Sequence, residues 1–274
     1  PGGPGGLRDR GEVGGVERVE KSVGVIHNVF ESAPTVAEGI RDVATTLGDL
    51  GAWSGPPPNV ISLSGDGGAL VIGLRSLLHT IHRRSQIAIF VQMNEVFANT
   101  GFQYSPTAIP FADSSTAPFG VPAEPMDYMG LAIAAGAGFA AQGSPAFAPF
   151  FAEVVDEALR CKETAVVFVF SPCIAGWKYE EGMTVELGKL ASQTGIFPCF
   201  RKRRGETGEV KHVPEKTKRP TVEKYLAAQR RFEHLVRMVD GQPKVTPGKE
   251  AQIAHLQSFA DRNVERLTRL AAAP

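Results

Sequence analysis

The sequence predicts an α/β fold, in which a parallel β-sheet is covered by flanking helices. Three short apolar runs have the composition of buried strands, and they lie at 60–63, 87–93 and 165–170. A glycine-rich turn and a helical pattern over 70–84 separate the first two runs. Strand, helix and strand in this order form a βαβ unit, which joins parallel strands and implies a sheet covered on both faces.

The remaining elements follow from hydrophobic periodicity and from breaks rich in glycine or proline. Helices are predicted over 30–50, 126–137, 149–161, 184–194, 221–239 and 249–271, a strand over 139–142, and a hairpin over 197–213. The stretch 99–125 contains five prolines and no clear period, so we expect a long ordered loop that covers a site. The predicted organisation is a flexible lead over 1–22, one main domain over 23–240 and a helical C-terminal extension over 241–274.

Composition narrows the class of protein. Lys+Arg and Asp+Glu both number 29, so the chain lacks the excess positive charge that non-specific nucleic-acid binding requires. The three cysteines, Cys161, Cys173 and Cys199, form no CxxC pair, which argues against a disulfide framework and favours a reducing cytoplasm. No apolar stretch is long enough to cross a bilayer, so we expect neither a membrane nor a nucleic acid as partner.

Polar residues follow the first two predicted strands. Asp66 comes directly after the first strand, and Asn94 follows the second. Because the carboxyl ends of parallel strands lie at one edge of a sheet, these side chains should lie close together. Mg²⁺ prefers oxygen ligands and shares them with phosphates, so Asp66, Asn94 and the backbone carbonyl of Val96 are the predicted metal ligands. The turn glycines would let a diphosphate approach the backbone at the start of the next helix, and they are Gly65, Gly67 and Gly68. The structural alternative is a tight turn with a strand-end cap.

This spacing resembles the thiamine-diphosphate signature, and several segments resemble one family in particular. Residues 94–107 (NEVFANTGFQYSPT) are similar to the NExYxNTGxQxS stretch of pyruvate:ferredoxin oxidoreductase β subunits. Further similar segments follow the family's order, and they are 26–33 (IHNVFESA), 144–146 (SPA), 171–177 (SPCIAGW), 186–198 (ELGKLASQTGIFP) and 218–235 (KRPTVEKYLAAQRRFEHL). The resemblance to a 2-oxoacid:ferredoxin oxidoreductase β subunit, of the pyruvate synthase type, thus runs from about residue 25 to about residue 238.

The resemblance implies a thiamine-diphosphate-binding fold and a heteromeric enzyme that oxidatively decarboxylates a 2-oxoacid, with pyruvate as the default. Asn99 would lie near the reactive thiazolium and act in catalysis with Thr100, while Gly101 would shape the same loop. Electrons would pass through an iron–sulfur cluster to ferredoxin, and the acyl group would go to coenzyme A. Subunits of the α, γ and δ type would be the partners, and the chain alone should be inactive.

The cysteines depart from the family pattern. Family β subunits generally begin with a CxxC pair and add a third cysteine, which hold a [4Fe–4S] cluster together with the cysteine of the SPC segment. Only Cys173 matches here, so either a segment with the other ligands is missing or the cluster is lost in a divergent member. Cys161 and Cys199 are expected to be small buried residues. The basic run 201–204 is expected to be a solvated hairpin, with a phosphate or coenzyme A contact as the alternative.

Two other functions stay open on the sequence. A non-redox thiamine-diphosphate decarboxylase or synthase would carry the same GDG and Asn spacing but would lack the NTG and SPC segments. A catalytically inactive assembly subunit is favoured by the missing cysteines. The presence of Asp66, Asn94 and Asn99 argues against it.

Overall fold

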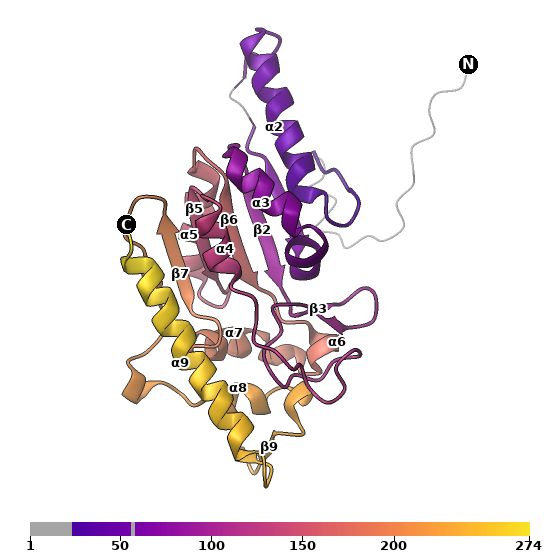
Figure 1. Cartoon of the computed structure of the whole chain (residues 1–274), viewed down its shortest axis with the longest axis vertical. Coiled ribbons are helices and arrows are strands. Elements are labelled where there is room, and N and C mark those ends of the chain that lie inside the picture. The colour runs from indigo at the N-terminus through magenta and orange to yellow at the C-terminus, as the bar shows by residue number, and fades with distance from the viewer. Residues whose placement is uncertain (1–23, 56–57) are drawn as a thin grey trace, which may run out of the picture.

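The computed structural model describes residues 24–55 and 58–274, and the predicted lead over 1–22 lies outside these residues. Its main sheet has the strand order β1-β2-β6-β5-β7-β8 (Figure 1). The strands are β1 (Ile61–Gly65), β2 (Ala88–Met93), β6 (Ala165–Phe170), β5 (Phe139–Gly143), β7 (Cys199–Arg203) and β8 (Glu209–Lys211). The first four pair in parallel, whereas β7 and β8 add an antiparallel hairpin at one edge. The predicted parallel sheet and the predicted hairpin are both confirmed.

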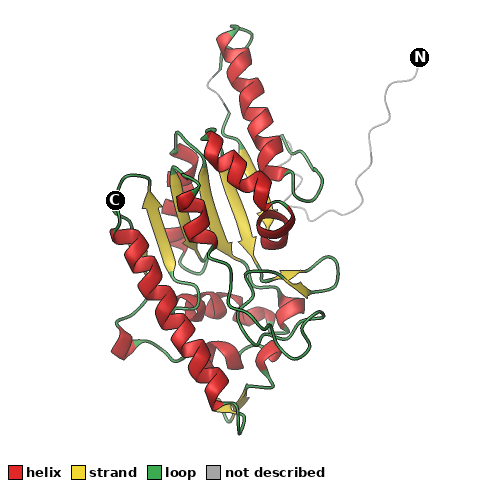
Figure 2. Cartoon of the chain, viewed as in Figure 1, coloured by secondary structure: helices red, strands yellow, loops and turns green. Residues whose placement is uncertain are grey.

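The central strands bury both of their faces. In β2, Ile89 and Val91 belong to one core with α3 (Leu74–Arg83) and α4 (Tyr128–Ala134). Phe90, between them, belongs to a second core with α5 (Ala148–Arg160). Successive side chains of a strand point to opposite faces, so a continuous apolar run serves two cores. Figure 2 shows the red helices in front of and behind the yellow strands, which confirms the fold class.

The helix predicted over 70–84 begins differently in the structure. A π-helical turn, Gly68–Ile72, comes first, and α3 starts only at Leu74. The Gly73 N–H donates to the Gly68 carbonyl at 2.8 Å. A Cβ on Gly73 would lie 2.5 Å from that oxygen, so this turn depends on glycine. Single π-turns of this kind are frequent at functional sites.

The helix predicted over 221–239 is wrong. The structure has α8 (Val222–Ala227), a 3-10 turn at Arg230–Phe232, and β9 (Val236–Val239), which pairs with β10 (Gln242–Val245). The helix ends early because Gln229 and Arg231 both turn into the interior. The Gln229 amide donates to the Tyr225 carbonyl at 2.7 Å, which closes the last turn.

The other elements are α2 (Ala33–Asp49), β3 (Val96–Phe97), β4 (Gln103–Tyr104), α6 (Ile174–Trp177), α7 (Thr184–Thr194) and α9 (Glu250–Ala272). α2 projects beyond the sheet, and α9 runs along β7 and the edge strand β8 (Figure 1). Asn263 in α9 donates to the carbonyls of Gly195 and Ile196 at 3.1 and 3.0 Å, which ties this helix to the main core. Among the described residues, no helix combines the length and apolar character needed to cross a bilayer.

Candidate cofactor site

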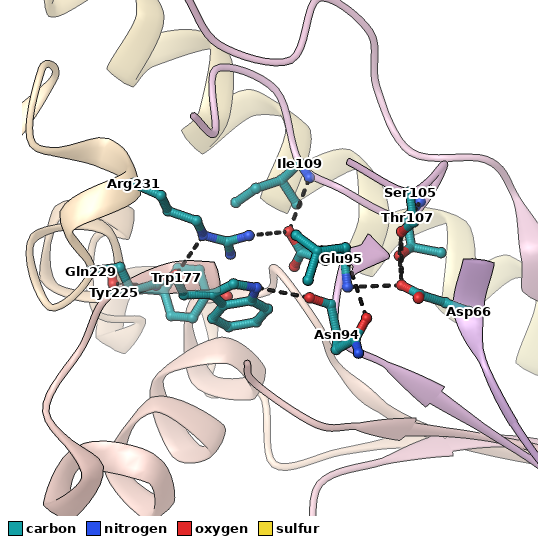
Figure 3. A network of polar contacts seen from close by, with 11 residues as sticks. Asp66, Asn94, Glu95, Ser105, Thr107, Ile109, Trp177, Tyr225, Gln229 and Arg231 are labelled. Carbon is teal, nitrogen blue, oxygen red and sulfur yellow. Dashed lines mark hydrogen bonds and ion pairs between the residues drawn. The ribbon is translucent and has the colours of Figure 1, made fainter. Parts of the chain in front are cut away.

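The structure brings the two predicted strand-end residues to one edge of the sheet. Asp66 follows Gly65, the last residue of β1, and Asn94 follows Met93, the last residue of β2. β1 and β2 are adjacent and parallel, so both side chains lie at the same end of the sheet (Figure 3). This placement agrees with the prediction from the βαβ unit.

The Asp66 carboxylate is buried and accepts four hydrogen bonds. Its Oδ2 accepts from the backbone N–H of Glu95 at 2.7 Å, from the Ser105 hydroxyl at 2.8 Å and from the Thr107 hydroxyl. Its Oδ1 accepts from the Gly67 N–H at 2.8 Å. A carboxylate offers about two lone-pair positions on each oxygen, so Oδ1 retains room for one further partner.

Burial raises the pKa of the Asp66 carboxyl above its usual value, because the ionised form loses its hydration. The hydrogen bonds from Thr107, Ser105 and the two backbone N–H groups oppose this effect. A cation beside Oδ1 would favour the ionised form further. The arrangement therefore fits a carboxylate that is completed by a positive partner.

Glu95 separates Asn94 from Val96 and has a left-handed backbone, with φ of 63°. The Ser105 N–H donates to its carbonyl at 3.0 Å. The Asn94 side-chain oxygen accepts from the Val96 N–H at 3.2 Å. A non-glycine residue in this conformation is strained and persists only where the surroundings hold it. The strain thus lies between two of the predicted metal ligands.

The oxygen donors at this edge fit Mg²⁺. Asp66 contributes a carboxylate, Asn94 an amide oxygen and Val96 a backbone carbonyl, which are the hard ligands that this ion prefers. Over residues 24–55 and 58–274, no group of three or more His, Cys, Asp or Glu side chains could hold a metal. That finding is compatible with a site that uses a single carboxylate.

Aromatic rings flank the glycine turn. A Cβ on Gly67 would lie 2.5 Å from the Phe97 ring, and one on Gly68 would lie 3.6 Å from the Phe30 ring. Beside Gly65, by contrast, nothing lies within 4 Å of the Cβ position. The backbone at Gly65 is thus open on its Cβ side, whereas Phe97 takes the space beside Gly67.

The predicted catalytic residues lie at the tip of the β3–β4 hairpin. Asn99, Thr100 and Gly101 are exposed, and Gly101 has φ of 112°, a backbone conformation that L side chains rarely adopt. The Thr100 hydroxyl donates to the Gln103 side chain at 2.6 Å. None of the three is among the hydrogen-bond partners that the described chain supplies to Asp66. The structure therefore places them at an exposed hairpin tip, without a hydrogen bond to Asp66.

The three cysteines do not form a ligand set. Cys173 caps α6, where its Sγ accepts from the Gly176 N–H at 3.3 Å. Cys161 and Cys199 are buried in the core beside α5, as expected, and burial raises the pKa of both thiols. Cys173 is thus the one cysteine outside that core.

The arginines of the basic run 201–204 pair with glutamates around the hairpin edge. The Arg201 guanidinium bonds to Glu153, Glu157 and Glu209 at 2.9, 2.8 and 2.6 Å. Arg204 pairs with Glu163. These acidic partners argue against a phosphate contact. The predicted solvated hairpin is only partly right, because Lys202 is buried and donates to the Glu206 carbonyl at 2.5 Å.

The sequence did not reveal a network that joins this edge to the C-terminal part (Figure 3). Arg231 donates to the Glu95 carboxylate at 2.7 Å, and its Cζ lies 3.7 Å from the centre of the Trp177 ring. The Trp177 indole donates to the Asn94 carbonyl at 2.8 Å. Trp177 and Arg231 lie within segments that resemble the family, but the resemblance does not say which residues contact each other. Glu95 and Arg231 are 136 positions apart in the sequence. No local periodicity connects residues at that separation. Ser105 and Thr107 were missed as partners of Asp66 for the same reason.

Comparison with known proteins gives consistent matches. Residues 37–169 match the model for the thiamine pyrophosphate enzyme C-terminal TPP binding domain. Pyruvate synthase subunit PorB of Methanosarcina barkeri is 32% identical over 246 residues, which cover 88% of this chain and 77% of that protein. PorB of Methanocaldococcus jannaschii is 33% identical over 216 residues, with coverage of 77% and 72%. Ketoisovalerate oxidoreductase subunit VorB of Pyrococcus abyssi is 27% identical over 218 residues, with coverage of 78% and 70%.

The matched domain contains both Asp66 and Asn94. The similarity to the PorB subunits continues far beyond it, over most of the chain and most of their length. The chain therefore belongs to the family of β subunits of 2-oxoacid:ferredoxin oxidoreductases, together with the pyruvate synthase PorB subunits.

Proposed function

We propose that this chain holds Mg²⁺ and the diphosphate of thiamine diphosphate in an oxidoreductase that decarboxylates pyruvate. The observation that carries the proposal is a pair of side-chain oxygens at adjacent strand ends, Asp66 Oδ1 and Asn94 Oδ1, each of which accepts a single hydrogen bond from the described residues. They lie inside the matched thiamine pyrophosphate domain. When bound, thiamine diphosphate supplies the nucleophile for the 2-oxo carbon and the electron sink for loss of CO₂.

The chain's own residues then have three tasks. Asp66, Asn94 and the Val96 carbonyl bind the metal, which neutralises the diphosphate. Ser105 and Thr107 favour the ionised form of the Asp66 carboxylate through their hydroxyl donors. The hairpin tip around Asn99 and Thr100 is exposed, so these side chains are available to the 2-oxoacid once a partner subunit covers the site.

Coenzyme A as acyl acceptor and ferredoxin as electron acceptor belong to the same proposal, and they are supported by family membership. Cys173 would be one of four ligands to a [4Fe–4S] cluster. One thiolate cannot hold such a cluster, and the other two cysteines are buried in a separate core. The remaining thiolates would therefore have to come from outside the sequence printed above.

The proposal includes partner subunits, which an apolar surface supports. Large apolar side chains are exposed on α2, β1 and the π-turn, which are neighbouring elements at the β1 edge of the sheet. We call this the β1-edge surface, and its members are Val43, Leu47, Leu50, Ile61, Leu63, Val71 and Ile72. Extended exposed apolar patches are typical of protein–protein contacts. Because the π-turn continues directly from Asp66 and Gly67, a subunit docked here would reach the cofactor site.

The decisive variant is Asp66→Asn, which keeps the shape of the side chain and removes its charge. In the full chain copurified with its partner subunits, calorimetry should show magnesium-dependent binding of thiamine diphosphate. The variant should bind at least a hundredfold more weakly, because neutral Asn is a poor ligand for a divalent cation. Asp156→Asn, on the exposed face of α5, is the matched control and should bind normally. Equal affinity in Asp66→Asn and the control would contradict the proposal.

The substrate and the redox chemistry need a separate assay. Viologen reduction should depend on pyruvate and coenzyme A, and kcat/KM should be higher for pyruvate than for 2-oxoisovalerate. The VorB similarity makes the branched 2-oxoacid the natural competitor. Loss of CO₂ without viologen reduction would favour a non-redox decarboxylase instead.

A further inference from the structure

We propose that Arg231 is a positioning residue, which holds the metal ligands Asn94 and Val96 in place by acting through Glu95 and Trp177. The inference rests on the proposed magnesium site and adds a role that neither the strand-end motif nor the family comparison assigns. The juxtaposition that carries it is a buried Glu95–Arg231 pair directly behind the strained turn between the two ligands (Figure 3).

Glu95 is held at each of its polar groups. Its N–H donates to Asp66 at 2.7 Å, and its carbonyl accepts from the Ser105 N–H at 3.0 Å. Its carboxylate accepts from Arg231 at 2.7 Å and from the Ile109 N–H at 3.2 Å. A strained left-handed residue stays in that conformation only when its surroundings over-determine it. The side-chain bonds therefore take part in fixing the backbone direction on both sides of residue 95.

Arg231 also supports Asn94, indirectly, through its contact with the Trp177 ring. Its guanidinium lies 3.7 Å from the centre of the Trp177 ring, and the Trp177 indole donates to the Asn94 carbonyl at 2.8 Å. Gln229 accepts from the Arg231 Nε at 2.9 Å and fixes the plane of the guanidinium. One cation thus supports Glu95 directly and Asn94 through the indole.

Stability alone does not explain this buried pair. Arg231 is 3% exposed and Glu95 is 6% exposed, so both charges have lost their hydration. The Arg231 Nη2 has no hydrogen-bond partner among the described residues. Well-packed apolar residues often replace buried ion pairs without loss of stability. What they cannot supply is a directed bond to the Glu95 carboxylate, and that bond fixes the turn.

The consequence should be measurable in metal affinity. Residues that orient metal ligands without touching the metal typically contribute about 10-fold to 100-fold to its affinity. Loss of the Arg231 bond would free the Glu95 side chain and relax the turn. The Asn94 side chain and the Val96 backbone would then no longer be fixed in their present positions on either side of residue 95.

The test uses Glu95→Gln/Arg231→Met in the full chain copurified with its partner subunits. The double variant removes the pair without leaving a buried unpaired charge, whereas Arg231→Met alone should lower Tm by roughly 10 °C. We expect the double variant to melt within a few degrees of the wild type and to bind Mg²⁺ about 10-fold to 100-fold more weakly in the presence of thiamine diphosphate. Mn²⁺ in place of Mg²⁺ should give an altered paramagnetic resonance spectrum, which a merely structural role would not change.

Two further variants complete the test. Arg231→Lys, which keeps a cation beside Glu95, should recover most of both the affinity and the melting temperature that Arg231→Met loses. Arg201→Met breaks a comparable set of ion pairs at the distant hairpin edge and should leave metal affinity unchanged.

The outcomes separate the two proposals. In one outcome, the double variant matches the wild type in Mg²⁺ affinity and Mn²⁺ spectrum while Asp66→Asn fails to bind the cofactor. That result would overturn the role of Arg231 but would leave the proposed magnesium site intact. The role of Arg231 would also be overturned if Arg231→Lys regained the melting temperature but not the Mg²⁺ affinity. Magnesium-independent cofactor binding by the wild type, or normal binding by Asp66→Asn, would remove the proposed function and this inference together.

Discussion

Asp66 shows how single residues at this edge combine burial with charge. Desolvation raises the pKa of its carboxyl, while two hydroxyls and two backbone N–H groups favour the ionised form. The pKa nevertheless stays raised, so the four hydrogen bonds offset only part of the cost of burial. Asn99 is the opposite case, because its side chain is exposed and needs no such support.

Asn99→Ala tests the catalytic role that the family resemblance implies. Because the side chain is exposed at a hairpin tip, we expect the free energy of unfolding to change by no more than about 0.5 kcal/mol. Cofactor affinity should stay nearly normal, since the residue is not a predicted metal ligand. Removal of one well-placed donor typically lowers kcat roughly a hundredfold.

The measurement is 2-oxoacid-dependent viologen reduction by the assembled enzyme, together with Tm and calorimetric cofactor affinity on the same preparation. A parallel loss of rate, cofactor affinity and Tm would show that Asn99 only shapes the turn before Gly101. Near-normal turnover would exclude both roles.

Two glycines on neighbouring elements differ in whether their surroundings leave room for a side chain. Gly73 ends the π-turn, and a Cβ there would lie 2.5 Å from the Gly68 carbonyl and 2.9 Å from the Glu31 carbonyl. Gly39 lies on the exposed side of α2, where nothing is within 4 Å of the Cβ position. Position 73, directly after the π-turn, therefore excludes a side chain, whereas position 39 in α2 has room for one.

The same substitution should accordingly have opposite effects at the two sites. Gly73→Ala should destabilise the chain by about 1–3 kcal/mol, because backbone atoms cannot move aside cheaply. Gly39→Ala should stabilise it by about 0.5–1 kcal/mol, because alanine loses less backbone entropy in a helix. Urea unfolding of both variants beside the wild type measures the difference. Similar midpoints for the two variants would contradict the close approach of the backbone at Gly73.

At the scale of the whole molecule, the apolar surface is unevenly distributed. The sheet centre is covered on both faces, but α2 and β1 leave the β1-edge surface exposed. β1 is also an edge strand, with only β2 beside it in the sheet. An uncovered apolar edge promotes association, which agrees with membership of a multi-subunit family.

Leu63→Lys should separate assembly from folding. Leu63 is 68% exposed on β1, so we expect the free energy of unfolding of the chain to change by no more than about 0.5 kcal/mol. A charge on the β1-edge surface should nevertheless prevent copurification of the partner subunits. Val185→Lys, at an exposed position of α7 away from this edge, is the matched control. A normal complex with Leu63→Lys would place the interface elsewhere.

The sequence by itself determined the parts of this protein that depend on local pattern. Continuous apolar runs define β2 and β6, a long 3.6-residue pattern defines α9, and turn residues define the hairpin of β7 and β8. The GDG turn and Asn94 were recognisable because each directly follows a strand. Parallel pairing then brings the two strand ends together without further information.

Only the tertiary structure decided features that depend on distant partners. The helix predicted over 221–239 breaks because Arg231 bonds to Glu95 in the interior, 136 positions away. The same holds for Ser105 and Thr107, whose hydroxyls reach Asp66 from a loop without periodicity. A buried charge or carboxylate must find its partners wherever the fold places them, and its energy outweighs the local propensity of a few residues. Local sequence therefore determined where the proposed metal ligands lie, and long-range packing decided what holds these residues in place.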